Sequence, residues 1–449
     1  MTRGMATTTP MPASVPARDR VNLVGFAGLV GLSAALQVSI AAAGICLGLM
    51  LAGWLASLVI HRERAQIPFV FLPLLAYAAL TLISSAFAPD PRASFVDDKQ
   101  LVLFLIVPAV YHLANESRAR LVLTVIITVG ALSALIGIVQ YGVLNYDDLG
   151  RRPEGLLTHY MTYSGVLVLV ICAAGARVLF SQERIWPALM MPALLVALAL
   201  TSTRSAWVGA SVAMALLLAS KNLKFVTLLP VLAAIFFALA PHQLVTRAYS
   251  MFDLTDPTIR DRFVMLRIGG RMIADHPLTG VGPNMVQPLY AQYRAADEGD
   301  TINPHLHNVP VQIAAERGLP ALGAWLWFVG LLVVDLTRRL KSTRDRYLPA
   351  TALAATIGML AAGLFEYNFG DSEFLMLFLL LVTLPYAAER TDASSVPEVP
   401  RPGEDHGESA LVGRGDDLGV AQGAAGLHDG RGAGVGHRIE PVAERKERV

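Results

Sequence analysis

Long runs of apolar residues limit what this chain can fold into. Several reach the roughly 20 residues that an α-helix needs to cross a bilayer. With 54% hydrophobic and 16% charged residues among 449, and a mean hydropathy of +0.52, the chain is more apolar than a typical soluble globular protein. We therefore predict an all-α, polytopic membrane protein with about twelve transmembrane helices. The predicted spans lie near residues 21–38, 40–60, 67–87, 100–114, 119–141, 162–180, 185–201, 205–220, 224–240, 319–336, 348–365 and 373–388.

The distribution of lysine and arginine predicts which helix ends face the cytoplasm. Sixteen of these residues fall in short segments on the side of the N-terminus, and five fall in the short loops of the other side. Because short cytoplasmic loops carry the excess positive charge, we expect both termini in the cytoplasm. The long loop at 241–318, between the ninth and tenth spans, is then external. The expected organisation is a cytoplasmic segment 1–20, a membrane domain 21–390, and a disordered cytoplasmic tail 391–449 that is polar and lacks aromatic residues.

The long loop has the sequence features of folded, helical structure. Asp256-Pro257 is a typical helix start, and the helix is expected to end near Asp275. Gly280 and Gly282, set between prolines, predict a tight and conformationally demanding turn. Apolar residues on one side of the helix can pack against the membrane spans; they are Ile259, Phe263, Leu266 and Ile273. Arginines share a neighbouring side; they are Arg260, Arg267 and Arg271.

Further cationic and titratable side chains occupy segments predicted to be external. Arg204 lies in a very short connection close to hydrocarbon, where a charge is costly unless it is paired or reaches water. Arg152 and the loop arginines could join it to bind a polyanion such as a diphosphate, because guanidinium groups bind phosphate oxygens in a bidentate way. An unperturbed histidine side chain can hold or release a proton near neutrality, so His305 and His307 are candidate general bases. Each of these residues, taken singly, is equally explained as an interfacial, hydrogen-bonded or ion-paired side chain.

The sequence also argues against several kinds of cofactor and partner. Cys46 and Cys172 both lie in apolar runs, which disfavours a disulfide framework or a thiolate metal site. The acidic residues of the loops at 147–148 and 297–300 are most simply solvated side chains. We predict no metal ion and no other cofactor, and nucleic acid is not an expected partner.

Four motifs, in their order and spacing, carry a family resemblance. They are Arg152-x-x-Gly155, the segment Ser202-Thr203-Arg204-Ser205-Ala206-Trp207, Arg262 fifteen residues before Pro277, and His307-Asn308 followed by Glu316-Arg317-Gly318. Together they resemble the O-antigen ligase and polymerase superfamily of bacterial envelopes. The resemblance spans roughly 150–335, and the layout of the spans extends it over most of 20–390.

The resemblance implies a metal-independent, GT-C-type glycosyltransferase of the bacterial inner membrane. Its donor is a polyprenyl-diphosphate-linked glycan, bound at the periplasmic face among membrane lipid. The acceptor is the lipid A-core of lipopolysaccharide in the ligase subgroup, and another lipid-linked glycan repeat in the polymerase subgroup. Protein O-glycosylation is a variant of the same chemistry.

The resemblance also implies roles for individual residues. His307 is the expected general base, because the family pattern places its histidine directly before an asparagine, and His305 is its competitor. Arg204 and Arg262 are expected to hold the diphosphate, with Arg152 as a further contact. The expected supporting residues are Asn308 and Glu316, either of which could orient the base, and Arg267 and Arg271.

Two functional classes other than a transferase remain possible on the sequence alone. A transporter or flippase of polysaccharide precursors would place ionisable residues and broken helices at mid-membrane and provide a polar path through the bundle. A structural or scaffolding membrane protein would need neither feature. A transferase instead requires Arg204, Arg262 and His307 to converge beside a groove at one membrane face.

Overall fold

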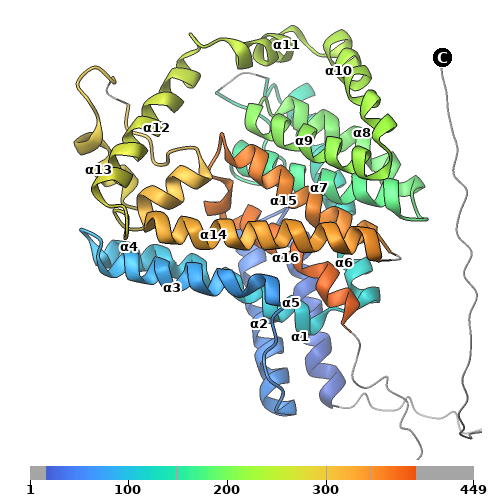
Figure 1. Ribbon diagram of the computed structural model, residues 1–449. Coiled ribbons are helices and arrows are strands. Elements are labelled where there is room, and N and C mark those ends of the chain that lie inside the picture. Colours follow the sequence, from blue (N-terminus) through green and yellow to red (C-terminus); the bar gives the residue numbers. More distant parts are fainter. Residues whose placement is uncertain (1–16, 148–149, 300, 344, 391–449) are drawn as a thin grey trace, which may run out of the picture. The chain divides into compact units, whose positions relative to one another are not determined.

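Helices make up the regular structure of the protein. The computed structural model (Figure 1) describes residues 17–147, 150–299, 301–343 and 345–390. These ranges contain sixteen α-helices, five 3-10 helices and no strand, which confirms the predicted all-α class. The expected tail at 391–449 and residues 1–16 of the expected N-terminal segment lie outside the described residues.

The part of the chain before the long loop contributes most of the apolar helices. Its α-helices are α1 (Ala17–Ala35), α2 (Ile40–His61), α3 (Leu72–Ala86), α4 (Pro91–Asp97), α5 (Ile106–Leu113), α6 (Glu116–Gly142), α7 (Tyr160–Phe180), α8 (Ile185–Leu200), α9 (Arg204–Lys221) and α10 (Leu228–Leu239). Its 3-10 helices are η1 (Phe69–Phe71), η2 (Asp98–Leu105) and η3 (Leu223–Thr227).

The long loop and the segments after it form the remaining helices. The loop carries α11 (His242–Tyr249), η4 (Ser250–Phe252), α12 (Pro257–Asp275) and α13 (Val286–Tyr293). After it come α14 (Val309–Ser342), α15 (Tyr347–Gly363), η5 (Asn368–Gly370) and α16 (Ser372–Glu389).

Length and apolar composition make this a multi-pass membrane protein. Six helical segments in the described ranges are long and apolar enough to cross a membrane: Ile40–His61, Phe69–Ala86, Glu116–Gly142, Tyr160–Phe180, Val309–Ser342 and Ser372–Glu389. Four shorter apolar helices accompany them: Arg20–Ala35, Ile185–Leu200, Leu223–Leu239 and Tyr347–Gly363. Every one of the twelve predicted spans overlaps helical structure, although the span predicted at 100–114 is divided between η2 and α5.

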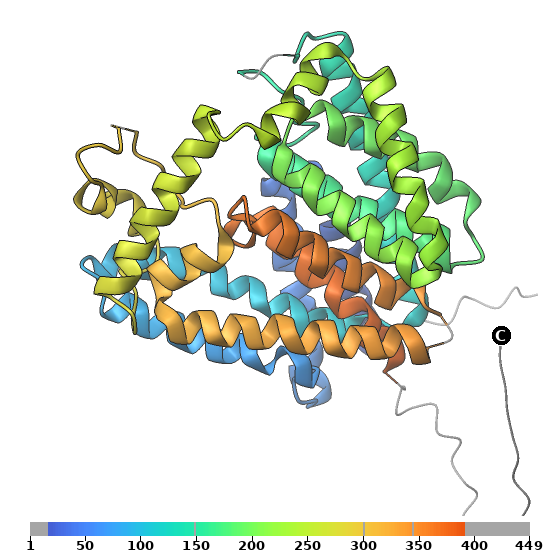
Figure 2. The same cartoon turned by 45° about the horizontal axis from the view of Figure 1, so that its top comes forward.

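Helices α7 and α16 form the centre of the membrane domain. In each of them 78% of the apolar window is buried inside the protein, compared with 28% for α2. Both are apolar on all sides, as expected for helices surrounded by other helices. Helix α15 packs against α7, α9, α14 and α16, and α14 runs along α3 (Figures 1 and 2).

The long loop folds over the ends of these helices with a small hydrophobic core of its own. Helix α12 has the bounds that the sequence predicts, because Asp256 caps its start by accepting a hydrogen bond from the backbone N–H of Thr258. The predicted packing side was wrong. The buried residues of α12 are Met265, Ile268, Gly269 and Met272, which lie about a third of a turn from the predicted stripe. They pack on α13 and the loop core, so the stripe of Ile259, Phe263 and Leu266 faces a cavity instead.

Helix α14 begins ten residues before the span predicted at 319–336. Asn308 caps it by accepting a hydrogen bond from Val311 N at 3.0 Å, and a kink at Gly318 (φ 81°, ψ 167°) separates a short first part from the apolar second part. The sequence suggested a later start because Gly318 and Pro320 are residues that commonly bound helices. The short first part carries the chain from His307 to the membrane domain.

A clamp between the predicted glycine turn and the α14 kink fixes the position of the loop. Val281 N and Gly282 N donate to the carbonyls of Ala315 and Glu316, each at 2.8 Å. Gly280 and Gly282 have φ values of 68° and 100°, as predicted for a demanding turn. A side chain at Gly280 would begin only 2.3 Å from the Glu316 backbone, so this close approach requires glycine.

Candidate functional site

A cavity of about 300 Å³ lies where the long loop meets the ends of the membrane helices. It is bounded by the start of α9, the η4 region, the first turns of α12, the residues before α14 and the connection after α15. Its polar lining consists of Arg204, Ser205, Arg262, His307 and Asn308. Its apolar lining consists of Val208, Met251, Leu254, Ile259, Phe263, Leu266, Leu306, Leu364 and Phe365. We call it the arginine–histidine cavity.

Arg204 is the first residue of α9 and is only 7% exposed. Its guanidinium donates to the carbonyl and the hydroxyl of Ser250 at 3.1 and 3.0 Å, and it forms an ion pair with Asp256 at 3.4 Å. These contacts stabilise a charge that lies close to hydrocarbon. They also tie α9 to the long loop, since Ser250 and Asp256 both belong to it.

Arg262 enters the cavity from the second turn of α12. Its guanidinium lies 5.9 Å from the centre of the Phe365 ring. Burial lowers its pKa, the nearby Glu366 carboxylate raises it, and the charge of Arg204 lowers it further. The guanidinium stays protonated because its ordinary pKa is so high, and its electrostatic coupling to Arg204 shows that two cations share this end of the cavity.

Arg152 stands behind the cavity and does not line it. Its guanidinium lies over the Tyr160 ring at 4.2 Å. Burial lowers its pKa, and the charge of Arg204 lowers it as well. Gln140 fixes the loop that carries it, accepting from Glu154 N and Gly155 N at 3.0 and 2.8 Å. Arg152 therefore adds positive potential at the Arg204 side of the cavity.

His307 borders the cavity in an unusual backbone conformation. Its φ of 46° lies in the left-handed region, which non-glycine residues seldom adopt and which often marks a functional site. Its Nδ1 lies 2.9 Å from Oε1 of Glu366, and the two side chains are 18% and 17% exposed. A hydrogen bond from Nδ1–H to the carboxylate leaves Nε2 as the ring nitrogen that can accept a proton.

Glu366 is the site residue that the sequence analysis missed. It follows α15 and lies 59 residues after His307 in the chain. Burial raises its pKa, but the hydrogen bond from His307 and the charges of His307 and Arg262 outweigh that effect, so the pKa is lowered. The available signal was the short polar connection between the spans at 348–365 and 373–388, which carries the two carboxylates Glu366 and Asp371.

Asn308 and His305 flank His307 and have different surroundings. Asn308 lines the cavity, and its amide donates to the carbonyl of Leu364 at 3.0 Å while it caps α14. It therefore holds the His307 segment against the connection that carries Glu366. The His305 ring packs 5.4 Å from the Tyr367 ring and is not among the residues that line the cavity. Burial and the neighbouring His307 lower the pKa of His305.

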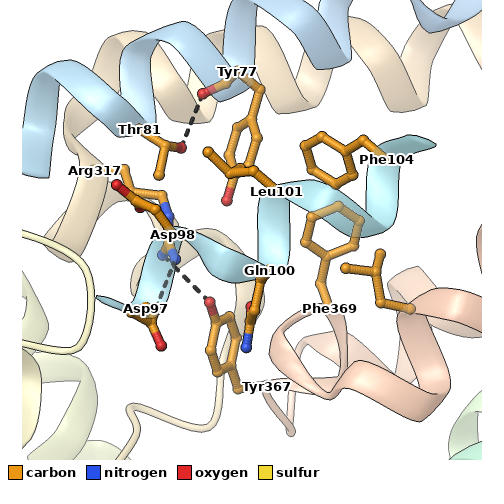
Figure 3. A pocket seen from close by; sticks show the side chains of 11 residues that line it. Tyr77, Thr81, Asp97, Asp98, Gln100, Leu101, Phe104, Arg317, Tyr367 and Phe369 are labelled. Carbon is orange, nitrogen blue, oxygen red and sulfur yellow. Dashed lines mark hydrogen bonds and ion pairs between the residues drawn. The ribbon is translucent and has the colours of Figure 1, made fainter. Parts of the chain in front are cut away.

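Glu316 lies in the frame behind the site and does not contact His307. Its carboxylate accepts from Asn284 N at 3.0 Å and from Arg317 at 2.6 Å. Arg317 lies between Asp97 and Tyr367, and Figure 3 shows all three residues lining a small pocket. This buried group of charges joins α4, the glycine turn and the α14 kink.

Arg267 and Arg271 are brought together with an acidic partner and not with the cavity. Arg271 forms two hydrogen bonds to Glu298 at 2.7 and 2.9 Å, and Arg267 lies 3.7 Å from the same carboxylate. The hydrogen bonds from Arg271 and Ala295 lower the pKa of Glu298 to about 2. These contacts fasten the 294–299 segment to α12.

The first turns of three helices border the cavity. Arg204 and Ser205 begin α9, Asp256 caps α12, and Asn308 caps α14. Helix N-termini present free N–H groups and a partial positive charge, which favour anions. Within the described ranges, no group of three or more histidine, cysteine, aspartate or glutamate side chains is arranged to hold a metal ion.

One family model matches the chain. The model describes O-antigen ligase, and it matches residues 188–326. This match supports the resemblance to the O-antigen ligase and polymerase superfamily. The matched segment includes Arg204, Arg262 and His307, whereas Arg152 and Glu366 lie outside it. No curated protein matches the chain.

Proposed function

We propose that this protein is an O-antigen ligase. It would transfer a glycan from a polyprenyl diphosphate to the lipid A-core of lipopolysaccharide, at the periplasmic face of the bacterial inner membrane. The observation that supports this most strongly is the convergence of Arg204, Arg262 and His307 on one cavity that is otherwise apolar. Such a cavity suits a donor with a charged diphosphate and an isoprenoid chain.

The proposed reaction assigns one task to each group around the cavity. Nε2 of His307 accepts the proton of the acceptor hydroxyl, and the acceptor oxygen forms a bond to the anomeric carbon of the glycan. The bond from that carbon to the diphosphate oxygen breaks, and its electron pair leaves with the diphosphate. Arg204 and Arg262 bind the charge that develops on the leaving group.

Glu366 and Asn308 hold the proposed base in place. The Glu366 carboxylate accepts from Nδ1 at 2.9 Å, which fixes the tautomer of His307 and stabilises the imidazolium that forms. Asn308 links the same segment to Leu364, two residues before Glu366. Both contacts are made to the connection after α15, so this connection restrains the segment that carries the base.

The charge distribution of the sequence supports a periplasmic site. The cavity lies at the ends of the helices joined by the 241–308 segment, which is the side opposite to the lysine- and arginine-rich short loops. Under the positive-inside rule this side is external. A lipid-linked donor would reach it from the outer leaflet.

The proposal is tested with purified protein in liposomes that contain the lipid-linked donor and a lipid A-core acceptor. We expect His307→Ala to reduce transfer by roughly 10²- to 10⁴-fold, the usual contribution of a general base, while the protein remains folded. His242→Ala, an exposed histidine of the same loop, is the matched control. Near-normal transfer by His307→Ala, or loss of transfer by His305→Ala alone, would contradict the assignment of the base.

The acceptor is tested in cells. A deletion strain that carries uncapped lipid A-core and polymerised chains still on the carrier would support the ligase. A strain whose core carries a single repeat would instead indicate a polymerase that uses a lipid-linked repeat as acceptor.

A further inference from the structure

Arg247 lies beside the site and is assigned no role by the motifs or by the cavity lining. It occupies the last turn of α11, three residues before Ser250, whose backbone carbonyl and hydroxyl accept hydrogen bonds from Arg204. The Ser250 hydroxyl donates in turn to the Arg247 carbonyl at 3.0 Å. The turn that carries Arg247 is therefore held directly against Arg204.

The half-buried side chain of Arg247 lacks a carboxylate partner among the described residues. Its Nε is buried without a hydrogen-bond partner, and no carboxylate forms an ion pair with it among the described residues. Burial lowers its pKa, and the charges of Arg204, Arg152 and Arg262 lower it further, against a single opposing effect from Asp256. Asp256 is already engaged by Arg204 and by the start of α12.

Positive charge is in excess around Arg247. The guanidiniums of Arg204, Arg247 and Arg262 influence one another, and we call them the arginine cluster. The carboxylates that oppose them are Asp256 and Glu366. Three positive charges therefore face two negative ones. Like charges in a partly buried place are unfavourable, so a bound anion stabilises the arrangement.

We propose that Arg247 is a further diphosphate-binding residue, which contacts the donor's phosphates together with Arg204 and Arg262. The inference rests on the proposed function, because the ligand class is the isoprenoid diphosphate of the donor. Its side chain would supply the Nε–H and the terminal N–H groups that bind phosphate oxygens in a bidentate way. It would also offset the additional negative charge that develops on the diphosphate when the glycan leaves.

Binding of farnesyl diphosphate to the full chain in phosphatidylcholine nanodiscs tests this proposal. The His307→Ala protein serves as the parent, so that no turnover occurs, and calorimetry gives the Kd. We expect Arg247→Gln to weaken binding by roughly 10- to 150-fold, the value of a hydrogen bond to a charged group. Arg247→Lys should weaken it less. Arg92→Gln, which removes an exposed arginine of α4, should bind like the parent.

Thermal unfolding separates a binding role from a structural one. Removing a like charge from the ligand-free arginine cluster should leave the midpoint of Arg247→Gln equal to the parent's or higher. A markedly lower midpoint, or a Kd equal to the parent's, would overturn the inference. So would unchanged farnesyl diphosphate binding combined with weaker binding to phosphatidylglycerol vesicles, since Arg247 would then contact bilayer phosphates. Absence of binding by the parent would instead count against the proposed function itself.

Discussion

Replacing Glu366 by glutamine should slow glycan transfer without loosening donor binding. The carboxylate accepts from His307 Nδ1 at 2.9 Å, and both side chains are less than one-fifth exposed, so water screens the interaction only weakly. A glutamine can still accept this hydrogen bond, but it cannot stabilise the charge of the imidazolium. A hydrogen bond to a charged group contributes about 1.5–3 kcal/mol, which corresponds to roughly a 10- to 150-fold lower kcat.

The same substitution removes a negative charge that acts on Arg262. Glu366 raises the pKa of that arginine, so the amide variant leaves the diphosphate side of the cavity more positive. The KM for the donor should therefore stay equal or fall while kcat falls. A role confined to folding would not produce this split, because loss of folded enzyme lowers the apparent kcat without changing the KM.

Steady-state transfer in liposomes, measured over a range of donor concentrations, provides both constants. Asp297→Asn makes the same change of carboxylate to amide at an exposed position of the long loop and should behave like the unaltered enzyme. A Glu366→Gln enzyme with normal kcat would show that the carboxylate does not support the base. A raised donor KM with unchanged kcat would show that the residue acts on the diphosphate side instead.

Two further substitutions test the frame of the site. Gly318→Ala should destabilise the protein by about 2–4 kcal/mol in thermal unfolding, because its Cβ would lie 2.2 Å from the Leu278 carbonyl oxygen at a φ of 81°. Gly323→Ala in the same helix is the control. Its Cβ would meet no atom within 4 Å, so it should leave the stability unchanged. Glu298 has a lowered folded-state pKa, so its stabilisation is present above about pH 4.5 and is lost as the pH falls toward 2. Glu298→Gln should remove this acid-dependent loss of stability. It should lower the free energy of unfolding by only about 1 kcal/mol at pH 7, since Arg267 and Arg271 are 63% and 40% exposed. Equal pH profiles of hydrogen exchange at 294–299 in the two proteins would contradict this prediction.

The features predicted most accurately from the sequence depend on local signals. Apolar runs located the long and the shorter apolar helices of the membrane domain, and Asp256-Pro257 located both the start and the cap of α12. The start of α14 was misplaced because Gly318 breaks the helical backbone within a continuous element. Hydrogen bonds from the 277–282 turn hold the two parts of α14 together at this break. Contacts of this kind join segments that are distant in the sequence, so they leave no local sequence pattern.

Local sequence signals also did not reveal which arginines border the cavity. Arg204, Arg262 and His307 come from three separate segments and border one cavity, whereas Arg267 and Arg271, on the same helix as Arg262, are paired with Glu298. Helical periodicity assigns residues to a side of α12, but it does not reveal which side meets a carboxylate. Glu366 escaped notice for a related reason, because its importance comes from a partner 59 residues away.

The cavity lies where the starts of three helices meet, and no single sequence motif indicates this meeting point. Helices α9, α12 and α14 all begin at its edge, so their free N–H groups and positive dipole ends favour an anion there. Arg204 stands at the start of α9, where positive charge is least favourable for the helix itself. A negatively charged ligand offsets both the charge of the arginine side chains and the positive dipole ends of the helices. The two sets of positive charge, from backbone and from side chains, therefore indicate the same kind of occupant independently.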